Sequence, residues 1–262
     1  MSDRLSRPER RALVREDERL LTLPMNIGGD PRRAEAHIRH AVHLLQSDRS
    51  SSPCTAVIAH ISALFDRTVP VTTKGEVACK RGCSHCCYQR VTVTAPEAFF
   101  IAGHIRTERA KTARVAEARQ QTKGLSLEER RHARVPCPLL VDAVCSIYAA
   151  RPIGCRGAMS LDVNACIGAY VDLKDNGIPM PLDHIKTMNV MRMMLCVALT
   201  LARLPTTGYE MIGAVAAALE DGAERRWLAG EDVFAGVEVD TSSPPVFLAQ
   251  VQKMAEHVAP SV

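Results

Sequence analysis

Apolar residues recur at helical spacing on both sides of the middle of the chain. In the predicted N-terminal helices, residues 31–70, each helix has one apolar face. The first helix starts at Asp30 and Pro31, which suit the N-cap and the first helical position. The second helix covers about residues 54–67. The apolar faces comprise Ile38, Ala41, Val42 and Leu45 in the first helix, and Val57, Ile58, Ile61, Leu64 and Phe65 in the second.

Two further helix starts carry the spacing of a capping box, in which the N-cap hydroxyl and a Glu side chain satisfy each other's backbone N–H groups. Thr94 and Glu97 form the first box, with a proline in the first turn. It predicts one long helix that continues to about Gln121. Ser126 and Glu129 form the second box, which predicts a short helix.

The remaining pattern fixes the fold class. Apolar residues on both sides of Asp142-Ala143 predict a small hairpin with its turn there. The C-terminal region, residues 171–262, is expected to be helical over about 183–204, 207–220, 223–228 and 243–258. Strands and helices do not alternate regularly, which argues against a doubly wound sheet or a TIM barrel. We therefore predict a mainly α protein, a helical domain with a loop-rich insert that binds metal through cysteines at residues 71–170.

Composition changes this picture little. The chain has 262 residues, 47% hydrophobic and 24% charged, which is typical of a globular protein, and only 4% are aromatic. The core must therefore be built mainly from aliphatic side chains. A net charge of +4 is too small to indicate nucleic-acid binding. Residues 1–30 are expected to be a charged, flexible arm, and runs such as Glu128-Glu129-Arg130-Arg131 are interpreted as solvent-exposed helix faces.

The predicted location rests on two features that the sequence lacks, a secretion signal and a membrane span. The N-terminus has no apolar segment typical of a secretion signal. The most apolar stretch, Met188–Leu204, is interrupted by Asn189, Arg192 and Arg203, so we expect a buried core helix rather than a membrane span. These features predict a cytoplasmic protein. They do not identify its partner, which we expect to be a protein or a small molecule. Cysteines in a reducing compartment more often bind metal or perform redox chemistry than form structural disulfides.

Eight of the ten cysteines lie between Cys79 and Cys166. Four fall within nine residues in the spacing C-x3-C-x2-C-C, which is not a packing pattern. Short spacings let one loop direct several thiolates at one ion, and Gly82 permits the tight backbone curvature that such a loop needs. The candidate metal ligands are Cys79, Cys83, Cys86, Cys87, Cys137, Cys145, Cys155 and Cys166.

The other cysteines and His85 are weaker candidates. Cys54 and Cys196 stand alone on predicted helix faces, and we interpret them as buried apolar residues. Cys166 fits either a ligand or a helix core position. His85 fits either a ligand or a solvent-facing neighbour of the motif. Eight thiolates fit two four-ligand sites, or one site together with redox-active thiols.

Thiolate ligands select zinc, Cu(I) or iron–sulfur centres. Four thiolates on zinc, or on an oxidised cubane cluster, leave a net charge of about −2 by formal counting. Arg151 and Arg156 suit such a charge, and Tyr148 suits a shield against water, so these three are our candidate cofactor-contacting residues. Further cations near the motif are Lys80, Arg81 and Arg90.

The cysteine motifs together resemble those of the YkgJ-type CxxCxxCC family. The matching pieces are the C-x3-C-x2-C-C run, C-P-x-L at Cys137, and C-x-I-Y-x-x-R-P-x-x-C-R from Cys145 to Arg156. The first gap has three residues here instead of two. The resemblance covers roughly residues 75–170 and implies zinc or iron chelation. Flagellin lysine N-methylase has a similar cysteine pattern and is associated with an iron–sulfur cluster and S-adenosylmethionine.

Several functions fit these features. The unequal spacings and the resemblance favour a cysteine-ligated iron–sulfur cluster, of the 4Fe-4S type, with a redox or cluster-dependent enzymatic role. A structural zinc site is the first alternative, although only Cys83 and Cys86 have the spacing of a zinc knuckle. A redox or oxygen sensor and an S-adenosylmethionine-dependent methyltransferase also remain open. Radical S-adenosylmethionine chemistry is disfavoured because His85, not an aromatic residue, precedes the third cysteine.

Overall fold

A computed structural model describes residues 31–47, 52–69, 77–174, 177–241 and 243–259 of the chain. The described helices are α2 (Pro31–Gln46), α3 (Pro53–Thr68), α5 (Ala95–Ile105), α6 (Arg109–Thr122), α7 (Leu127–Ala133), α8 (Ile153–Gly157), α9 (Val163–Tyr170), α10 (Leu182–Leu201), α11 (Met211–Ala218), α12 (Ala223–Leu228) and α13 (Pro245–Val258), with 3-10 helices η1 (His85–Tyr88) and η2 (Tyr148–Ala150). The strands are β1 (Thr92–Thr94), β2 (Leu140–Val141), β3 (Val144–Cys145) and β4 (Gly208–Glu210). The prediction of a mainly α protein is confirmed.

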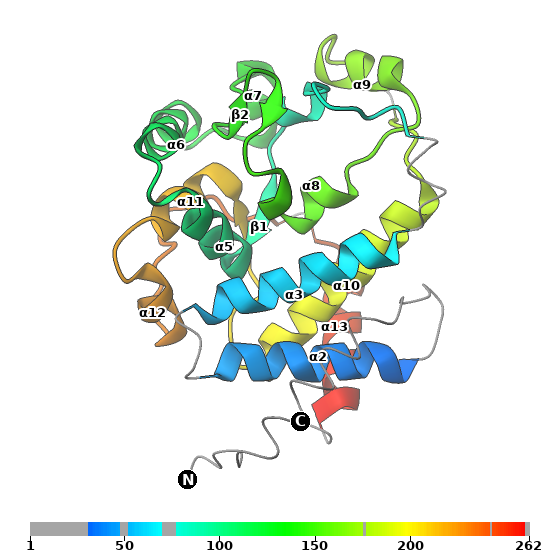
Figure 1. Ribbon diagram of the computed structural model, residues 1–262, viewed down its shortest axis with the longest axis vertical. Helices are drawn as coiled ribbons and strands as arrows, with labels where there is room; N and C mark the ends of the chain where they lie inside the picture. The colour runs from blue at the N-terminus through cyan, green and yellow to red at the C-terminus, as the bar shows by residue number, and fades with distance from the viewer. Residues whose placement is uncertain (1–30, 48–51, 70–76, 175–176, 242, 260–262) are drawn as a thin grey trace.

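The helices form a core around α10 and α5 (Figure 1). The long helix α10 lies against α2, α3, α8 and α13, and α5 lies between α3 and α11. The apolar faces predicted for the first two helices are buried, with Ile38 and Ile58 each 1% exposed. Aromatic side chains from three segments meet in this core, where Phe99 contacts Trp227 and Phe234 at ring-centroid distances of 5.7 and 5.4 Å. Burial of these faces supplies the main driving force for the helical packing.

The helix starts are largely as predicted. The first helix begins at Pro31, while the expected N-cap Asp30 and the arm of residues 1–30 lie outside the described residues. Both capping boxes are present, at Thr94 with Glu97 and at Ser126 with Glu129. Cys54 and Cys196 are buried, 0% and 8% exposed, as expected for apolar positions.

The predicted long helix from Thr94 to about Gln121 is wrong, because the chain forms two helices. The first, α5, is buried on nearly every side, whereas α6 is mostly polar. The chain bends between them at residues 106–108. Arg106 contributes to this bend by donating hydrogen bonds to the carbonyls of Ala218 and Leu219 at the end of α11. The bend lets both helices pack against α11, which a straight helix does not permit.

Two small antiparallel sheets complete the fold. The hairpin of β2 and β3 is confirmed, and both turn residues, Asp142 and Ala143, have positive φ values of 49° and 58°, as a tight hairpin turn requires. The pairing of β1 with β4, in which Val93 faces Tyr209, was not predicted. These strands are three residues long and far apart in sequence, so local periodicity does not reveal them. In the described part of the chain, no helix is both long and apolar enough to cross a membrane.

Candidate metal centre

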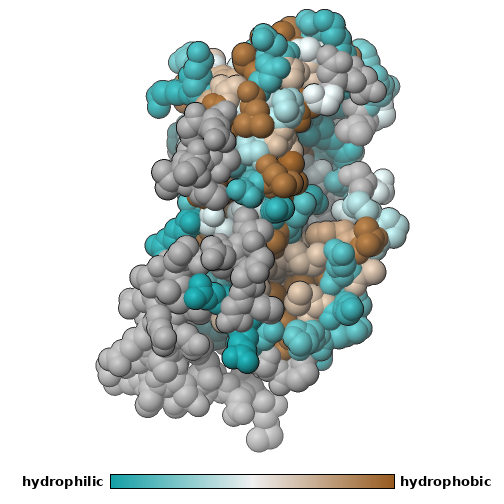
Figure 2. Space-filling view, turned by 90° about the vertical axis from the view of Figure 1, so that its right-hand side faces the viewer, coloured by the Kyte–Doolittle hydropathy of each residue, from teal (hydrophilic) through white to brown (hydrophobic). Residues whose placement is uncertain are grey.

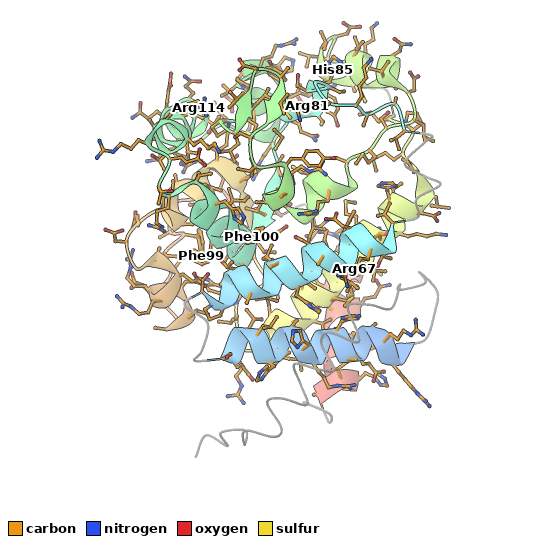
Figure 3. All side chains as sticks on the ribbon, in the orientation of Figure 1. Arg67, Arg81, His85, Phe99, Phe100 and Arg114 are labelled. Atoms are coloured by element: carbon orange, nitrogen blue, oxygen red, sulfur yellow. The ribbon has the colours of Figure 1, made fainter. Side chains whose placement is uncertain are left out.

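The eight candidate cysteines lie on five segments at one end of the molecule. Cys79 and Cys83 lie in the turn before η1, which carries Cys86 and Cys87. Cys137 precedes the β2–β3 hairpin and Cys145 ends it, while α8 carries Cys155 and α9 carries Cys166. Figure 3 shows Arg81 and His85 at this end, away from Phe99 and Phe100 on α5. Gly82 has a φ of +87°, which confirms the tight curvature expected between Cys79 and Cys83.

Backbone hydrogen bonds join these segments. The N–H of Cys137 donates to the carbonyl of Cys87 over 2.7 Å, which places the hairpin beside η1. The N–H of Ala78 donates to the carbonyl of Ser160 over 2.7 Å, which places the start of the cysteine run beside the loop before α9. Helix α9 packs against η1. Cysteines up to 87 positions apart in sequence are therefore held in one region by main-chain contacts.

Cys79 belongs to an outer group of thiols. Burial raises its pKa, a hydrogen bond from the Ser160 N–H to its Sγ over 3.4 Å opposes that rise, and the charges of Cys83, Cys86 and Cys166 raise it further. The thiols that act on Cys79 therefore come from two segments. Cys83 and Cys86 belong to the cysteine run, and Cys166 belongs to α9. Cys166 is 7% exposed, so its helix position is buried, and its charge acts on Cys79.

Cys155 belongs to an inner group. Burial raises its pKa well above the usual range, the charges of Cys137, Cys86 and Cys145 add to the rise, and Arg151 opposes it. Burial likewise raises the pKa of Cys137 to about 11, with a further contribution from Cys145. At Cys137 and Cys155, a metal would have to displace thiol protons that burial favours.

Cys86 connects the two groups. Its pKa is raised chiefly by a hydrogen bond with the Cys87 side chain, then by burial and by the charge of Cys87, and it is lowered by Arg151. The pKa of Cys79 in the outer group and that of Cys155 in the inner group both respond to the charge of Cys86. The eight thiols therefore form a continuous set arranged around η1.

The donor set consists of sulfur atoms, which is the chemistry of zinc, Cu(I) and iron–sulfur sites. Among the residues that the structure describes, no three His, Cys, Asp or Glu side chains are arranged so that they could hold one metal ion without moving. Binding therefore requires both loss of thiol protons and side-chain adjustment, as is common where metal binding is coupled to folding. The residue types and their convergence fit a thiolate-bound metal.

Comparison with known protein families gives a match for the cysteine-bearing segment. Residues 78–173 match the CxxCxxCC family. The family is described as "Putative zinc- or iron-chelating domain", and the matched range contains all eight candidate cysteines. The match confirms the resemblance seen in the sequence, and it supports metal binding by this segment. Searches of curated proteins and of solved structures found no match to the chain.

Of the two arginines expected near a cofactor, only Arg151 faces the thiols of the CxxCxxCC segment. Its guanidinium lies 3.7 Å from the centroid of the Tyr148 ring, and its charge lowers the pKa of Cys86 and of Cys155. Tyr148 is 60% exposed, so it covers Arg151 from the solvent side. This stacked pair places a cation beside the inner thiols.

Arg156 has different partners. Its side chain is buried, and Nη1 donates to both carboxylate oxygens of Asp66 on α3 over 2.8 Å. The same guanidinium donates to the carbonyls of Ala149 and Arg151. Arg156 therefore anchors the turn before Cys155 to the helical core, and this anchoring fixes the position of Arg151.

Three residues of the CxxCxxCC segment join the thiols without having been predicted. Ser160 contributes the backbone donor to Cys79. Burial, followed by the charges of Cys86 and Cys166, raises the pKa of Tyr170 to about 12. Tyr170 lies four positions after Cys166, so shared-face spacing on a helix is a signal that points to it.

Arg130 is the third residue near the thiols that was not predicted. It was expected on a solvent-exposed helix face, and that prediction is wrong, because Arg130 is only 2% exposed. The run of charged residues around it, Glu128-Glu129-Arg130-Arg131, does not reveal its burial. Its guanidinium donates a hydrogen bond to the carbonyl of Tyr88, the last residue of η1, and its charge acts on Cys137.

Proposed function

We propose that the protein is an iron–sulfur protein whose CxxCxxCC segment holds cysteine-ligated 4Fe-4S centres with a redox or cluster-dependent enzymatic role. The observation that carries the proposal is that main-chain hydrogen bonds and helix packing bring the Cys79–Cys87 run together with the segments that carry Cys137 and Cys166. Eight cysteines within the matched segment are more than one structural zinc ion needs.

The two groups suggest how the ligands divide. The outer group supplies Cys79, Cys83 and Cys166, and the inner group supplies Cys137, Cys145 and Cys155. Each group of three needs one further thiolate to reach the four that a cubane cluster takes. The adjacent pair Cys86 and Cys87 provides one for each, which gives two sites.

The surrounding residues suit such centres. A bound iron–sulfur cluster supplies one-electron transfer at a potential set by charge, burial and hydrogen bonds to sulfur. Arg151 provides a fixed positive charge near the inner group, and the Ser160 N–H provides a hydrogen bond to the outer sulfur Cys79. Tyr170 is partly buried near Cys86 and Cys166, at the end of α9, which packs against η1.

Zinc is the competing metal, because the family description names both metals. The deciding experiment is anaerobic purification of the full chain, with iron, acid-labile sulfide and zinc quantified beside an absorption spectrum. Iron and sulfide in about equal amounts, with visible absorption bleached by dithionite, support the proposal. A colourless protein with stoichiometric zinc and no sulfide overturns it in favour of a structural zinc protein.

A further inference from the structure

Arg130 is a buried cation that the family motif does not include. It lies in α7, outside the cysteine spacings, and it is among the largest fully buried side chains in the described part of the protein. Burying a charged side chain has a high free-energy cost unless it is paired and hydrogen-bonded. The partners of Arg130 therefore indicate why the charge is there.

The hydrogen bonding of this guanidinium is incomplete. Nη1 donates to the carbonyl of Tyr88 over 3.3 Å, while Nε is buried and has no hydrogen-bond partner among the described residues. Tyr88 directly follows Cys87, whose carbonyl accepts from the N–H of Cys137. Arg130 is thus attached to the junction where the cysteine run meets the hairpin.

Two negative or potentially negative groups lie near Arg130. Glu210 is 4% exposed, and its two carboxylate oxygens already accept hydrogen bonds from the N–H groups of Ile212 and Gly213 at the start of α11, at 3.0 and 2.7 Å. Cys137 is the other group. Burial lowers the pKa of Arg130, whereas the charges of Glu210 and Cys137 raise it. Since Glu210 is engaged by the helix N-terminus, its compensation of Arg130 is shared, and the thiol side is left to supply the rest.

We infer that Arg130 is a positioning residue for the metal centre, whose buried charge compensates the negative charge of the thiolate-bound metal on the Cys137 side. This inference rests on the proposed function. Four thiolates around zinc or an oxidised cubane cluster carry a net charge of about −2. Arg130 and Arg151 then approach the inner thiols from two elements, α7 and the turn before α8.

The inference predicts different effects of one substitution on the stability of the metal-free protein and on its affinity for metal. Arg130→Met removes the charge but keeps an apolar side chain. In the metal-free protein, this replacement removes an incompletely bonded buried cation, so the thermal unfolding midpoint should stay equal or rise. In the metal-loaded protein, the thiolates lose a compensating charge, and affinity should fall by about 10–100-fold, as for other groups that support metal ligands.

The test uses Co²⁺ as the probe, because its thiolate charge-transfer absorption reports binding directly. Arg130→Met, Arg130→Lys and Arg119→Met are titrated beside the wild-type chain, and the unfolding of each metal-free protein is measured. Arg119 is the matched control, a partly buried arginine on α6 paired with Glu238. We expect weakened Co²⁺ binding in Arg130→Met, substantial recovery in Arg130→Lys, and wild-type affinity in Arg119→Met.

Other results overturn the inference. Equal Co²⁺ affinity in Arg130→Met and wild type means that the charge does not act on the centre. Weaker binding accompanied by an equal loss of metal-free stability, with no recovery in Arg130→Lys, means that Arg130 only supports the fold. If the purified wild-type chain holds neither iron nor zinc and does not bind Co²⁺, the proposed function itself fails, which is a separate outcome.

Discussion

The carboxylate of Glu97 accepts a hydrogen bond from the backbone N–H of Ile153 over 2.8 Å. Its other oxygen accepts from the N–H and hydroxyl of Thr94, so one buried side chain both caps α5 and holds the first residue of α8. Cys155 lies two positions further along α8. The helical core therefore positions an inner thiol through a capping residue.

Glu97→Gln should destabilise the protein and reduce its metal content. The amide NH₂ group cannot accept the hydrogen bond that one carboxylate oxygen receives, so buried donors lose partners at a cost of about 1–3 kcal/mol. Glu129→Gln is the matched control, because Glu129 holds the same place in a capping box and is exposed. Urea unfolding and metal analysis should show the larger loss at Glu97. Equal losses would mean that the contact with α8 is unimportant.

Gly157 allows α8 to approach α10. A Cβ placed there would lie 2.6 Å from Sδ and 2.8 Å from Cβ of Met188. We expect Gly157→Ala to lower the free energy of unfolding by about 1–3 kcal/mol, the usual range for overpacking. A Met188→Ala background removes the close contacts with Sδ and Cγ but leaves the Cβ contact at 2.8 Å, so the same substitution should cost less there and still destabilise the protein. Additive effects in this double-mutant cycle, measured by urea unfolding, would contradict the steric explanation.

Replacing Cys86 by Ser should lower the metal content, because Cys86 is one of the proposed ligands and lies near thiols of both groups. The control is Cys196→Ser, a buried position on α10 away from the set. That variant should lose stability but keep its metal. Metal per chain, determined on anaerobically purified protein, separates the two effects. Wild-type metal content in Cys86→Ser would remove Cys86 from the ligand set.

Acid should remove one stabilising contact at Glu238. Burial raises its pKa, but hydrogen bonds from the Gly124 N–H and from Arg119 outweigh burial, so the net pKa is lowered. A carboxyl group with a lowered pKa stabilises the folded state at pH values above its unfolded pKa of about 4.3, and this stabilisation is lost as pH falls through the folded value. Glu238→Gln should therefore be less stable than wild type at pH 7, and the difference should shrink towards pH 3.

The control for this pH series is Glu231→Gln, which removes a surface ion pair with Arg226. Exposed pairs of this kind contribute little to stability. Urea unfolding at pH 7 and at pH 3 gives the comparison. A gap between wild type and Glu238→Gln that persists unchanged at pH 3 would show that the carboxylate charge is not the cause.

Local patterns predicted most of the helices because the features that start them act over a few residues. The capping boxes at Thr94 and Ser126 and the helical face of Ile38 and Leu45 were correct for this reason. The bend after Ile105 was not predicted, because it depends on the carbonyls of α11, more than a hundred positions away. The β1–β4 pairing was not predicted for the same reason, because it joins segments that are also more than a hundred positions apart.

The face of the molecule drawn in Figure 2 was examined for a hydrophobic patch of the kind that marks a binding surface. Figure 2 shows hydrophobic and hydrophilic residues interspersed on the side that it presents. Exposed apolar side chains such as Leu182, at 62%, are ordinary on protein surfaces when they are scattered.

The sequence by itself determined the mainly α class, the eight candidate cysteines and the family of the segment that carries them, because these depend on periodicity and on the spacing of one residue type. Only the tertiary structure decided which thiols are neighbours and which cations reach them. Arg156 has the motif position of a cofactor residue but is bonded to Asp66, while Arg130 has none and lies beside Cys137. Electrostatic effects depend on distance and burial, and both are set by packing between segments remote in sequence.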